Sequence, residues 1–198
     1  MTTTLREARD ATVLMRRSVV DDVSATLVVR AQLGDVPALD AVLRSVQDAV
    51  YDHIAYIMRD PDAAKDVLQT VLLTVCRTLI QLQNPRLFRA WVFRIATRAA
   101  VRARHRSRWH EASIPEDVPD LTQTEREPVV DDDLASLLRQ LVDELPPACG
   151  VAVRLRYLEE LSLAEVAEAL DVPVGTVKSR IAYGIELLRQ RVNPVSGG

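Results

Sequence analysis

The segment Leu161–Gln190, LSLAEVAEALDVPVGTVKSRIAYGIELLRQ, decides the fold of this chain. Its spacing of apolar residues predicts two short amphipathic helices joined by a tight turn. Ser162 is suited to cap the first helix, and Glu165, three residues later, completes a capping box. The triplet Asp171-Val172-Pro173 ends that helix, because a proline disfavours helical geometry in the residue before it. The segment therefore predicts a helix-turn-helix.

The second helix of this pair carries the candidate DNA-reading residues. Its apolar positions are expected to face inward at Val177, Ile181, Ile185 and Leu188. Polar and basic residues near its start are what a reader of the major groove requires, and the candidates are Thr176, Lys178, Ser179, Arg180 and Tyr183. The alternative is an ordinary helical hairpin, in which Arg180 pairs with Glu165 or Glu168 across the two helices.

The composition predicts an all-α protein. The chain has 198 residues, 48% hydrophobic residues and only 6 glycines, enough for one medium or two small helical domains. No apolar run approaches the ~20 residues of a membrane span, so we expect a cytoplasmic protein without membrane insertion. The cysteines and histidines have no metal-ligand spacing, and no phosphate loop or nucleophile motif is present. We therefore expect no metal, no cofactor and no enzymatic activity.

Charge is strongly segregated along the chain. The net charge is −3, yet residues 67–110 contain nine arginines and no acidic residue. Residues 111–133 reverse the sign, with nine acidic residues against Arg126. Such blocks indicate a basic binding surface followed by an acidic tether, because closely spaced arginines repel each other unless an anionic partner is present.

An aromatic and arginine-rich segment lies within the basic block. Arginines bind phosphates, and aromatic rings stack on unpaired bases for ~1–3 kcal/mol each, so the combination favours single-stranded DNA. The candidate residues are Phe88, Arg89, Trp91, Arg94, Arg98 and Arg102. The alternative is that Phe88, Trp91 and Ile95 form the core stripe of a helix.

Breaks in the helical pattern divide the chain into two helical domains. In the first, helices are predicted near residues 37–58, 63–79 and 87–106, with a stop and a new cap at Gly34-Asp35. The second domain is expected to contain four helices. The predicted organisation is an N-terminal extension (1–23), a helical domain (24–110), an acidic flexible linker (111–131), a second helical domain (132–192) and a tail (193–198).

Five segments resemble the extracytoplasmic-function (ECF) sigma factors of bacterial RNA polymerase. The stretch PVGTVKSR (173–180) resembles the start of their recognition helix, and DELPP (143–147) resembles the entry to their region four. In the first half, LVVRAQLGD (27–35), AKDVLQTV (64–71) and FRAWVFRIA (88–96) resemble region two. Together these resemblances cover nearly all of residues 25–190 apart from the linker.

The resemblance implies a transcription initiation factor whose partners are core RNA polymerase and promoter DNA, with an anti-sigma factor as a further candidate. It assigns polymerase contact to Asp66, Gln69 and Leu73, melting of the −10 element to the segment from Phe88 to Arg102, and −35 recognition to the helix from Thr176 to Tyr183. From the residues alone, Asp66 is better explained as a solvated side chain, and only the resemblance makes it a polymerase contact.

The chain departs from the family pattern at several positions. Lys65, Thr70 and Leu72 are among the residues that replace the usual acidic and aromatic ones, and Arg98 and Arg102 replace asparagine and aspartate. Two alternative functions therefore remain: a helix-turn-helix regulator that acts without polymerase, and a degenerate sigma-like interaction protein.

Overall fold

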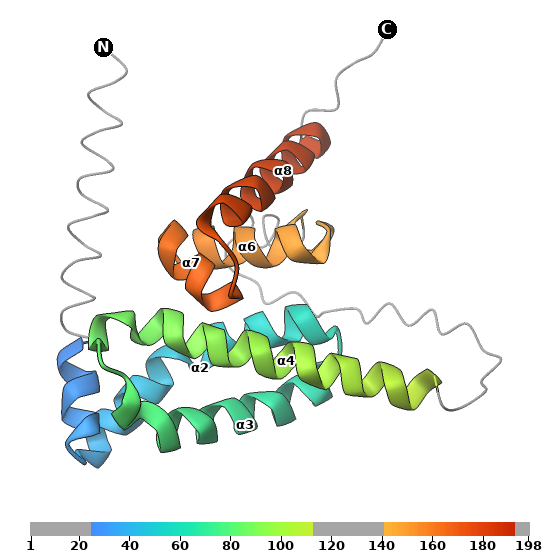
Figure 1. Cartoon of the computed structure of the whole chain (residues 1–198). Helices are drawn as coiled ribbons and strands as arrows, with labels where there is room; N and C mark the ends of the chain where they lie inside the picture. Colours follow the sequence, from blue (N-terminus) through green and yellow to red (C-terminus); the bar gives the residue numbers. More distant parts are fainter. Residues whose placement is uncertain (1–24, 113–140, 193–198) are drawn as a thin grey trace, which may run out of the picture.

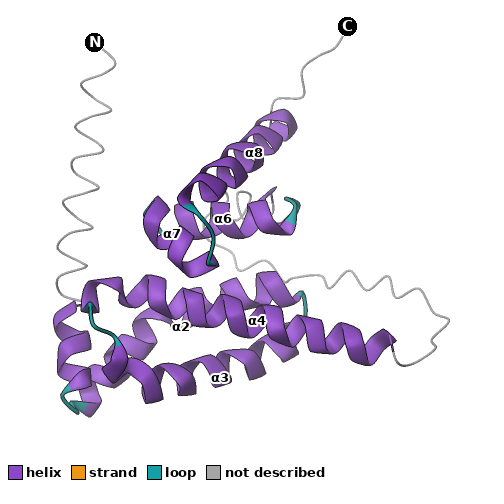
Figure 2. Cartoon of the chain, in the orientation of Figure 1, coloured by secondary structure: helices purple, strands orange, loops and turns teal. Residues whose placement is uncertain are grey.

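The computed structural model describes residues 25–112 and 141–192, with side chains as far as residues 106 and 191. These residues form helices and short connections, without a strand among them (Figures 1 and 2). The all-α fold predicted from composition is confirmed. The predicted N-terminal extension, most of the acidic linker and the C-terminal tail lie outside the described residues.

Three long helices form the N-terminal half, which comprises residues 25–112: α2 (Val36–Met58), α3 (Pro61–Thr78) and α4 (Phe88–Ala112). The preceding helical residues 25–32 end at Gly34, whose φ of 91° favours glycine. Asp35 caps α2 by accepting a hydrogen bond from the Ala38 N–H at 3.0 Å. Asp60 caps α3 in the same way.

The helices of this half begin or end outside their predicted bounds. The α2 and α3 helices start one and two residues before the predicted positions, because Pro37 and Pro61 fit the first helical turn, where no N–H partner is needed. Two short 3-10 turns, η1 (Leu79–Gln81) and η2 (Pro85–Leu87), connect α3 to α4. The α4 helix extends to Ala112 rather than ending near residue 106.

The C-terminal half, residues 141–192, contains α6 (Pro147–Tyr157), α7 (Leu163–Leu170) and α8 (Val174–Val192). The predicted capping box of α7 is confirmed: Ser162 Oγ accepts from the Glu165 N–H at 3.2 Å, and Glu165 Oε2 accepts from the Ser162 N–H at 2.7 Å. The helix ends at Asp171, which has a left-handed φ of 56°. The α7–α8 pair is the predicted helix-turn-helix. Of the four helices expected here, the described residues contain these three and a helical turn at 141–143.

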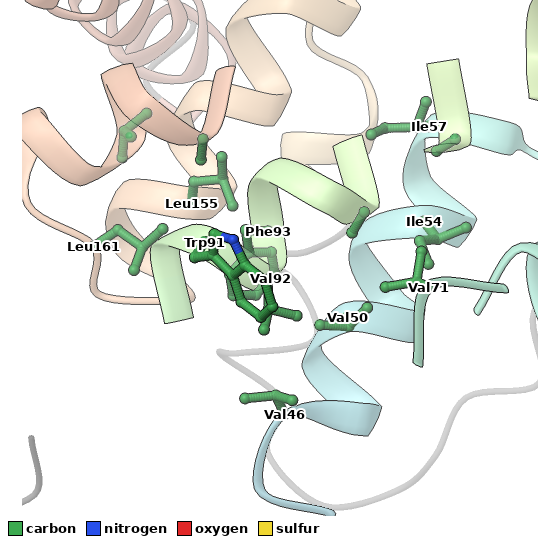
Figure 3. Close-up of a cluster of buried hydrophobic side chains, with 14 of the residues drawn as sticks. Val46, Val50, Ile54, Ile57, Val71, Trp91, Val92, Phe93, Leu155 and Leu161 are labelled. Atoms are coloured by element: carbon green, nitrogen blue, oxygen red, sulfur yellow. The ribbon is translucent and has the colours of Figure 1, made fainter. Parts of the chain in front are cut away.

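The two halves pack together through one continuous core. The C-terminal half lies over α4, with α7 against it, while α3 lies on the other side of α4 (Figure 1). The shared buried cluster draws side chains from α2, α3, α4 and the C-terminal half, among them Val46, Val50, Ile54, Val71, Trp91, Phe93, Leu155 and Leu161 (Figure 3). The sequence predicted two tethered domains, and the structure adds that they are in direct contact.

Candidate polymerase and nucleic-acid interfaces

The predicted polymerase-binding residues share one exposed face of α3, which we call the α3 face: Asp66, Gln69 and Leu73. Their spacing of three and four residues places them on the same side of the helix. The opposite side buries Val71 and Val75 completely. Leu73 is 49% exposed although it is a large apolar residue. Within the described residues, the side chains of Asp66 and Gln69 form no hydrogen bond or ion pair. The α3 face is therefore open to a partner.

The aromatic residues predicted to stack on DNA are buried. Phe88, Trp91 and Phe93 are 1%, 8% and 0% exposed, and they belong to the shared core. The Phe93 ring meets the His53 ring edge-on, with centroids 5.3 Å apart. In this conformation Phe88 and Trp91 have the environment of a core stripe, which was the alternative to DNA stacking, and Ile95, the third residue of that stripe, is half-buried. Sequence spacing could not separate the two interpretations, because both place Phe88 and Trp91 on one side of the helix.

Three predicted DNA-binding arginines of α4 instead bind carboxylates of the C-terminal half. We call Arg89, Arg94 and Arg98 the α4 arginine row. The pairs are Arg89–Glu159 at 3.1 Å, Arg94–Glu168 at 3.1 Å and Arg98–Asp171 at 2.9 Å. Arg102, one turn further on, is exposed and makes no ion pair among the described residues. For these three of the nine arginines in the basic block, the structure supplies carboxylates from within and near α7.

The recognition helix α8 is amphipathic as predicted. Val177 and Ile181 are buried, whereas Lys178, Ser179 and Tyr183 are exposed, Tyr183 by 57%. Thr176 is half-buried, and the predicted inward residues Ile185 and Leu188 are also half-buried rather than fully buried. Three of the five predicted DNA-reading side chains are thus presented to solvent.

Arg180 is half-buried and lines a cleft between the two halves. The cleft has a volume of about 500 Å³, and its other walls include Ile57, Thr97 and Val101. Within the described residues Arg180 forms no ion pair with Glu165 or Glu168, so the predicted alternative pairing is not found. Glu168 binds Arg94 instead. Arg180 thus lies at the edge of this cleft rather than fully in solvent.

A buried contact that sequence reasoning missed joins α6 to α2. Arg154 is 5% exposed, and its guanidinium lies over the Tyr56 ring, 4.9 Å from the centroid. It also donates to the Asp52 carbonyl oxygen at 3.4 Å and to Asp143 Oδ1 at 3.5 Å. Burial lowers the pKa of Arg154, and the Asp143 carboxylate opposes that shift. In the sequence, this contact is indicated only by Gly150, four positions before Arg154 on α6. A glycine there leaves room for the Tyr56 side chain.

His53 is a structural histidine whose protonation state follows from its hydrogen bond. Thr97 Oγ1 donates its one hydrogen to the Phe93 carbonyl oxygen, so it accepts the 2.8 Å bond from His53 Nε2. Nδ1 is buried and has no hydrogen-bond partner among the residues that the structure describes. Burial lowers the pKa of His53 to about 3, and the positive charge of Arg154 adds to the shift. No group of side chains suited to a metal ion occurs among the described residues. None of their helices is long and apolar enough to cross a bilayer.

This fold and these surfaces define a class: a helical protein with a helix-turn-helix, an arginine-rich helix packed against it and a separate exposed face on α3. Comparison with known proteins agrees with that class. Residues 42–110 match the family described as Sigma-70 region 2, and residues 135–188 match the family described as Sigma-70, region 4.

Several characterised proteins are similar over most of the chain. The RNA polymerase sigma-H factor of Pseudomonas aeruginosa is 29% identical over 181 residues, which cover 85% of this chain and 93% of that protein. The ECF RNA polymerase sigma factor SigW of Bacillus subtilis is 27% identical, covering 80% of this chain and 91% of SigW. SigE of Mycolicibacterium smegmatis is 32% identical, covering 78% of this chain and 61% of SigE.

Two solved structures share the fold. CnrH in complex with the cytosolic domain of CnrY has a TM-score of 0.60 at 19% identity, covering 87% of this chain and 99% of CnrH. The sigma factor RpoE in complex with the anti-sigma factor NepR from Bartonella quintana has a TM-score of 0.61 at 20% identity, covering 79% and 97%. The chain belongs to the sigma-70 family of RNA polymerase sigma factors, in its ECF group. It is an alternative sigma factor, a regulator of transcription initiation.

Proposed function

We propose that this sigma factor divides its work among three helices: the α3 face binds core RNA polymerase, α4 engages the −10 element, and α8 reads the −35 element. One observation carries the proposal. The chain presents an open face on α3 and, separately, a capped helix-turn-helix whose second helix exposes Lys178, Ser179 and Tyr183. A free-standing regulator needs the second of these surfaces but has no use for the first.

The α3 face is suited to a protein partner. Leu73 is a large apolar side chain surrounded by polar neighbours, and Asp66 and Gln69 are exposed beside it without internal partners among the described residues. An apolar anchor with polar groups around it is the usual composition of an interface hot spot. We assign core polymerase to this surface because the family works as a polymerase subunit.

On α8, the exposed side chains divide into two kinds of contact. Lys178 is a flexible point charge that suits a phosphate, whereas Arg180 has the planar fork that grips a guanine edge with two hydrogen bonds. Tyr183 stands where the family usually has a basic residue, and its ring can meet a thymine methyl group. We therefore propose that base preference depends on Arg180 and Tyr183, and that general affinity depends on Lys178.

On α4, the arginine row and Arg102 supply phosphate contacts along one side of the −10 segment. Phe88 and Trp91 are the candidate stacking residues, and both are buried in the core shared with the C-terminal half. We propose functional domains at residues 24–110 and 132–192, connected by residues 111–131.

An anti-sigma factor is a further candidate partner, because the related RpoE of Bartonella quintana was solved with one. As an initiation factor the chain works by binding rather than by catalysis, and its place of action is with RNA polymerase in the cytoplasm. We base both the non-catalytic role and the cytoplasmic location on membership of the sigma factor family.

The test is a pull-down of core RNA polymerase by the tagged full chain, followed by transcription from a library of genomic fragments. We expect polymerase binding, and transcripts that begin at a shared promoter sequence. Tight, sequence-specific DNA binding by the free chain without polymerase binding would instead identify a free-standing regulator. Polymerase binding without promoter-specific transcription would identify a sigma-like interaction protein.

A further inference from the structure

We propose that the cleft lined by Arg180 is a binding site for a small amphipathic anion, that is, an apolar molecule that ends in one negatively charged group. Such a site goes beyond the role in transcription initiation, and it does not depend on the functions proposed for α3, α4 and α8. Three features of the cleft support it: its size and apolar walls, an arginine without a counterion, and the uncapped start of α6.

The cleft has the size and the walls of a small-molecule site. Its volume is about 500 Å³, and sites for small molecules in proteins commonly enclose about 300–1,000 Å³ with mostly apolar walls and a few polar groups. Five helices contribute to it: α2, α4, α6, α7 and α8. The apolar side chains of the wall are Ile57, Val101, Pro147, Ala148, Val151 and Leu170. An apolar molecular body would therefore find contacts on several sides.

The polar group that selects the ligand is Arg180. Its side chain is half-buried, and within the described residues it forms no hydrogen bond or ion pair. None of the described residues that line the cleft is acidic. A guanidinium group that is partly removed from water without a counterion is unfavourable, and its planar set of N–H donors matches an anionic group. The cleft thus lacks the negative charge that an anionic ligand would supply.

A second positive charge lies on the α4 side of the cleft. Arg104 Nη1 donates to the Ile57 carbonyl oxygen at 3.0 Å, which holds this guanidinium at the wall, and its charge acts on the cleft whichever other contacts it makes. The Thr97 hydroxyl group, by contrast, is already engaged, because it donates to the Phe93 carbonyl oxygen and accepts from His53. The charged side chains among the described lining residues are therefore positive, and they lie on two different helices.

The backbone of α6 adds to this positive potential. The first turn of α6 contributes Pro147 and Ala148 to the wall of the cleft. The N-cap residue is Pro146, which makes no side-chain cap hydrogen bond, and the first turn contains no acidic residue. The N-terminus of a helix carries a partial positive charge, because its peptide dipoles are aligned. This end of α6 consequently favours an anion in the cleft and has no carboxylate of its own.

The combination of walls and charge defines the class of ligand. A free inorganic anion would gain nothing from the apolar walls, since their contribution comes from removing apolar surface from water. A neutral apolar molecule would cover Arg180 without giving it a counterion, which is unfavourable. A molecule with an apolar body and one anionic group satisfies both parts of the cleft.

The test uses the full chain and two fluorescent probes with the same ring system. Anilinonaphthalene sulfonate carries one negative charge, whereas phenylnaphthylamine lacks the sulfonate and is neutral. We expect the sulfonate probe to bind at one saturable site, about tenfold more tightly than the neutral probe, because only the sulfonate can accept from Arg180. Decanoate should displace the sulfonate probe, whereas inorganic phosphate at the same ionic strength should not.

Two variants, each with a matched control, locate the site. Arg180→Gln should weaken binding of the sulfonate probe about tenfold and leave the neutral probe unchanged. Its control is Arg189→Gln, the same change on the same helix, at a side chain that is 74% exposed and does not line the cleft. Ala148→Trp should fill the cleft and weaken both probes about tenfold or more. Its control is Ala164→Trp, because Ala164 is also an exposed alanine at the second position of a helix and lies outside the cleft wall.

Circular dichroism establishes that each variant is folded before probe binding is compared. Equal affinity of Arg180→Gln and Arg189→Gln for the sulfonate probe would overturn the proposal, as would equal affinity of the parent chain for the two probes. Unchanged binding by folded Ala148→Trp would show that the probe lies elsewhere and would also overturn it. If Ala148→Trp does not fold, the comparison of the two arginine variants decides alone. Displacement by phosphate as effective as that by decanoate would leave a simple anion site, contrary to the proposal. These measurements use neither polymerase nor promoter DNA, so their outcome is independent of the proposed function.

Discussion

The guanidinium of Arg154 on α6 lies over the ring of Tyr56 on α2, 4.9 Å from its centroid. This contact is one of those that join the C-terminal half to the N-terminal half, and it depends on a glycine. A Cβ at Gly150 would lie 2.8 Å from Tyr56 Cζ, closer than real Cβ contacts, and closer still to the hydroxyl oxygen. The Tyr56 hydroxyl also donates to the Val142 carbonyl oxygen at 3.5 Å.

We therefore expect Gly150→Ala to separate the two halves. The added methyl group forces Tyr56 away from α6, while alanine is the better helix former, so α6 itself should remain intact. Small-angle X-ray scattering of the free chain should show a larger radius of gyration. The control is Gly175→Ala, because a Cβ at that position meets nothing within 4 Å. An unchanged scattering curve for Gly150→Ala would mean that Tyr56 moves aside within the closed arrangement.

His53 should make the folded chain sensitive to acid. Above pH 6.5 its imidazole is neutral in both the folded and the unfolded chain, so it does not change stability. Between pH 6.5 and about 3 the unfolded chain takes up a proton that the folded chain excludes. As the pH falls through this range, the free energy of unfolding should therefore decrease by about 1.4 kcal/mol for each unit of pH.

Urea unfolding at several pH values checks this, with His53→Gln as the comparison, since its amide can still donate to Thr97 Oγ1. The difference in stability between the parent and the variant should change with pH over this window. If the difference in unfolding free energy between the parent and His53→Gln stays constant from pH 7 to pH 4, His53 is not a buried neutral histidine.

Leu73→Ala should weaken binding to core polymerase without affecting folding. The side chain is 49% exposed in the free chain, so its loss removes contact mainly with a partner. Burial of a leucine side chain at an interface corresponds to about 1.5 kcal/mol, or roughly tenfold in affinity. Ile80→Ala is the matched control, because Ile80 is 74% exposed but lies in η1, beyond the α3 face. Equal affinities for the two variants would remove Leu73 from the interface.

The recognition helix should separate affinity from specificity. Lys178→Ala should weaken binding of the polymerase complex to all promoters alike and reduce the salt slope by about one, because a phosphate contact is lost. Arg180→Ala should relax preference at one base pair of the −35 element by about 1–3 kcal/mol. A promoter-library selection measures both effects, with Arg189→Ala as control. Unchanged base preference in Arg180→Ala would move the readout to another residue.

Trp91→Ala should lower stability. The side chain is 8% exposed in the shared core, and removal of a buried tryptophan costs about 3–5 kcal/mol. Thermal unfolding measures this loss. If the variant instead keeps its melting temperature and polymerase affinity, yet fails on duplex promoters and is rescued by a promoter opened with mismatches, the ring acts mainly on DNA.

Local features of the fold could be predicted because each depends on a few neighbouring residues. The Ser162–Glu165 capping box, the stop at Gly34, the cap at Asp35 and the end of α7 at Asp171 all lie where the sequence indicated. Helix bounds moved by one or two residues where a proline fits a first turn. The exposure of the α3 face and of Lys178 follows from helical period alone, since burial of one face of a helix dictates the position of the other.

The pairing between the halves is a property of the tertiary structure. Sequence alone determined that this chain is helical and that it contains a helix-turn-helix, and it predicted a basic block suited to an anionic partner. It could not determine that Glu168 meets Arg94, that Trp91 is buried, that Arg180 faces a cleft, or that His53 is held neutral. Those outcomes depend on how two distant segments approach each other. The periodicity of apolar residues along a helix indicates that one face is buried, but not which segment covers it.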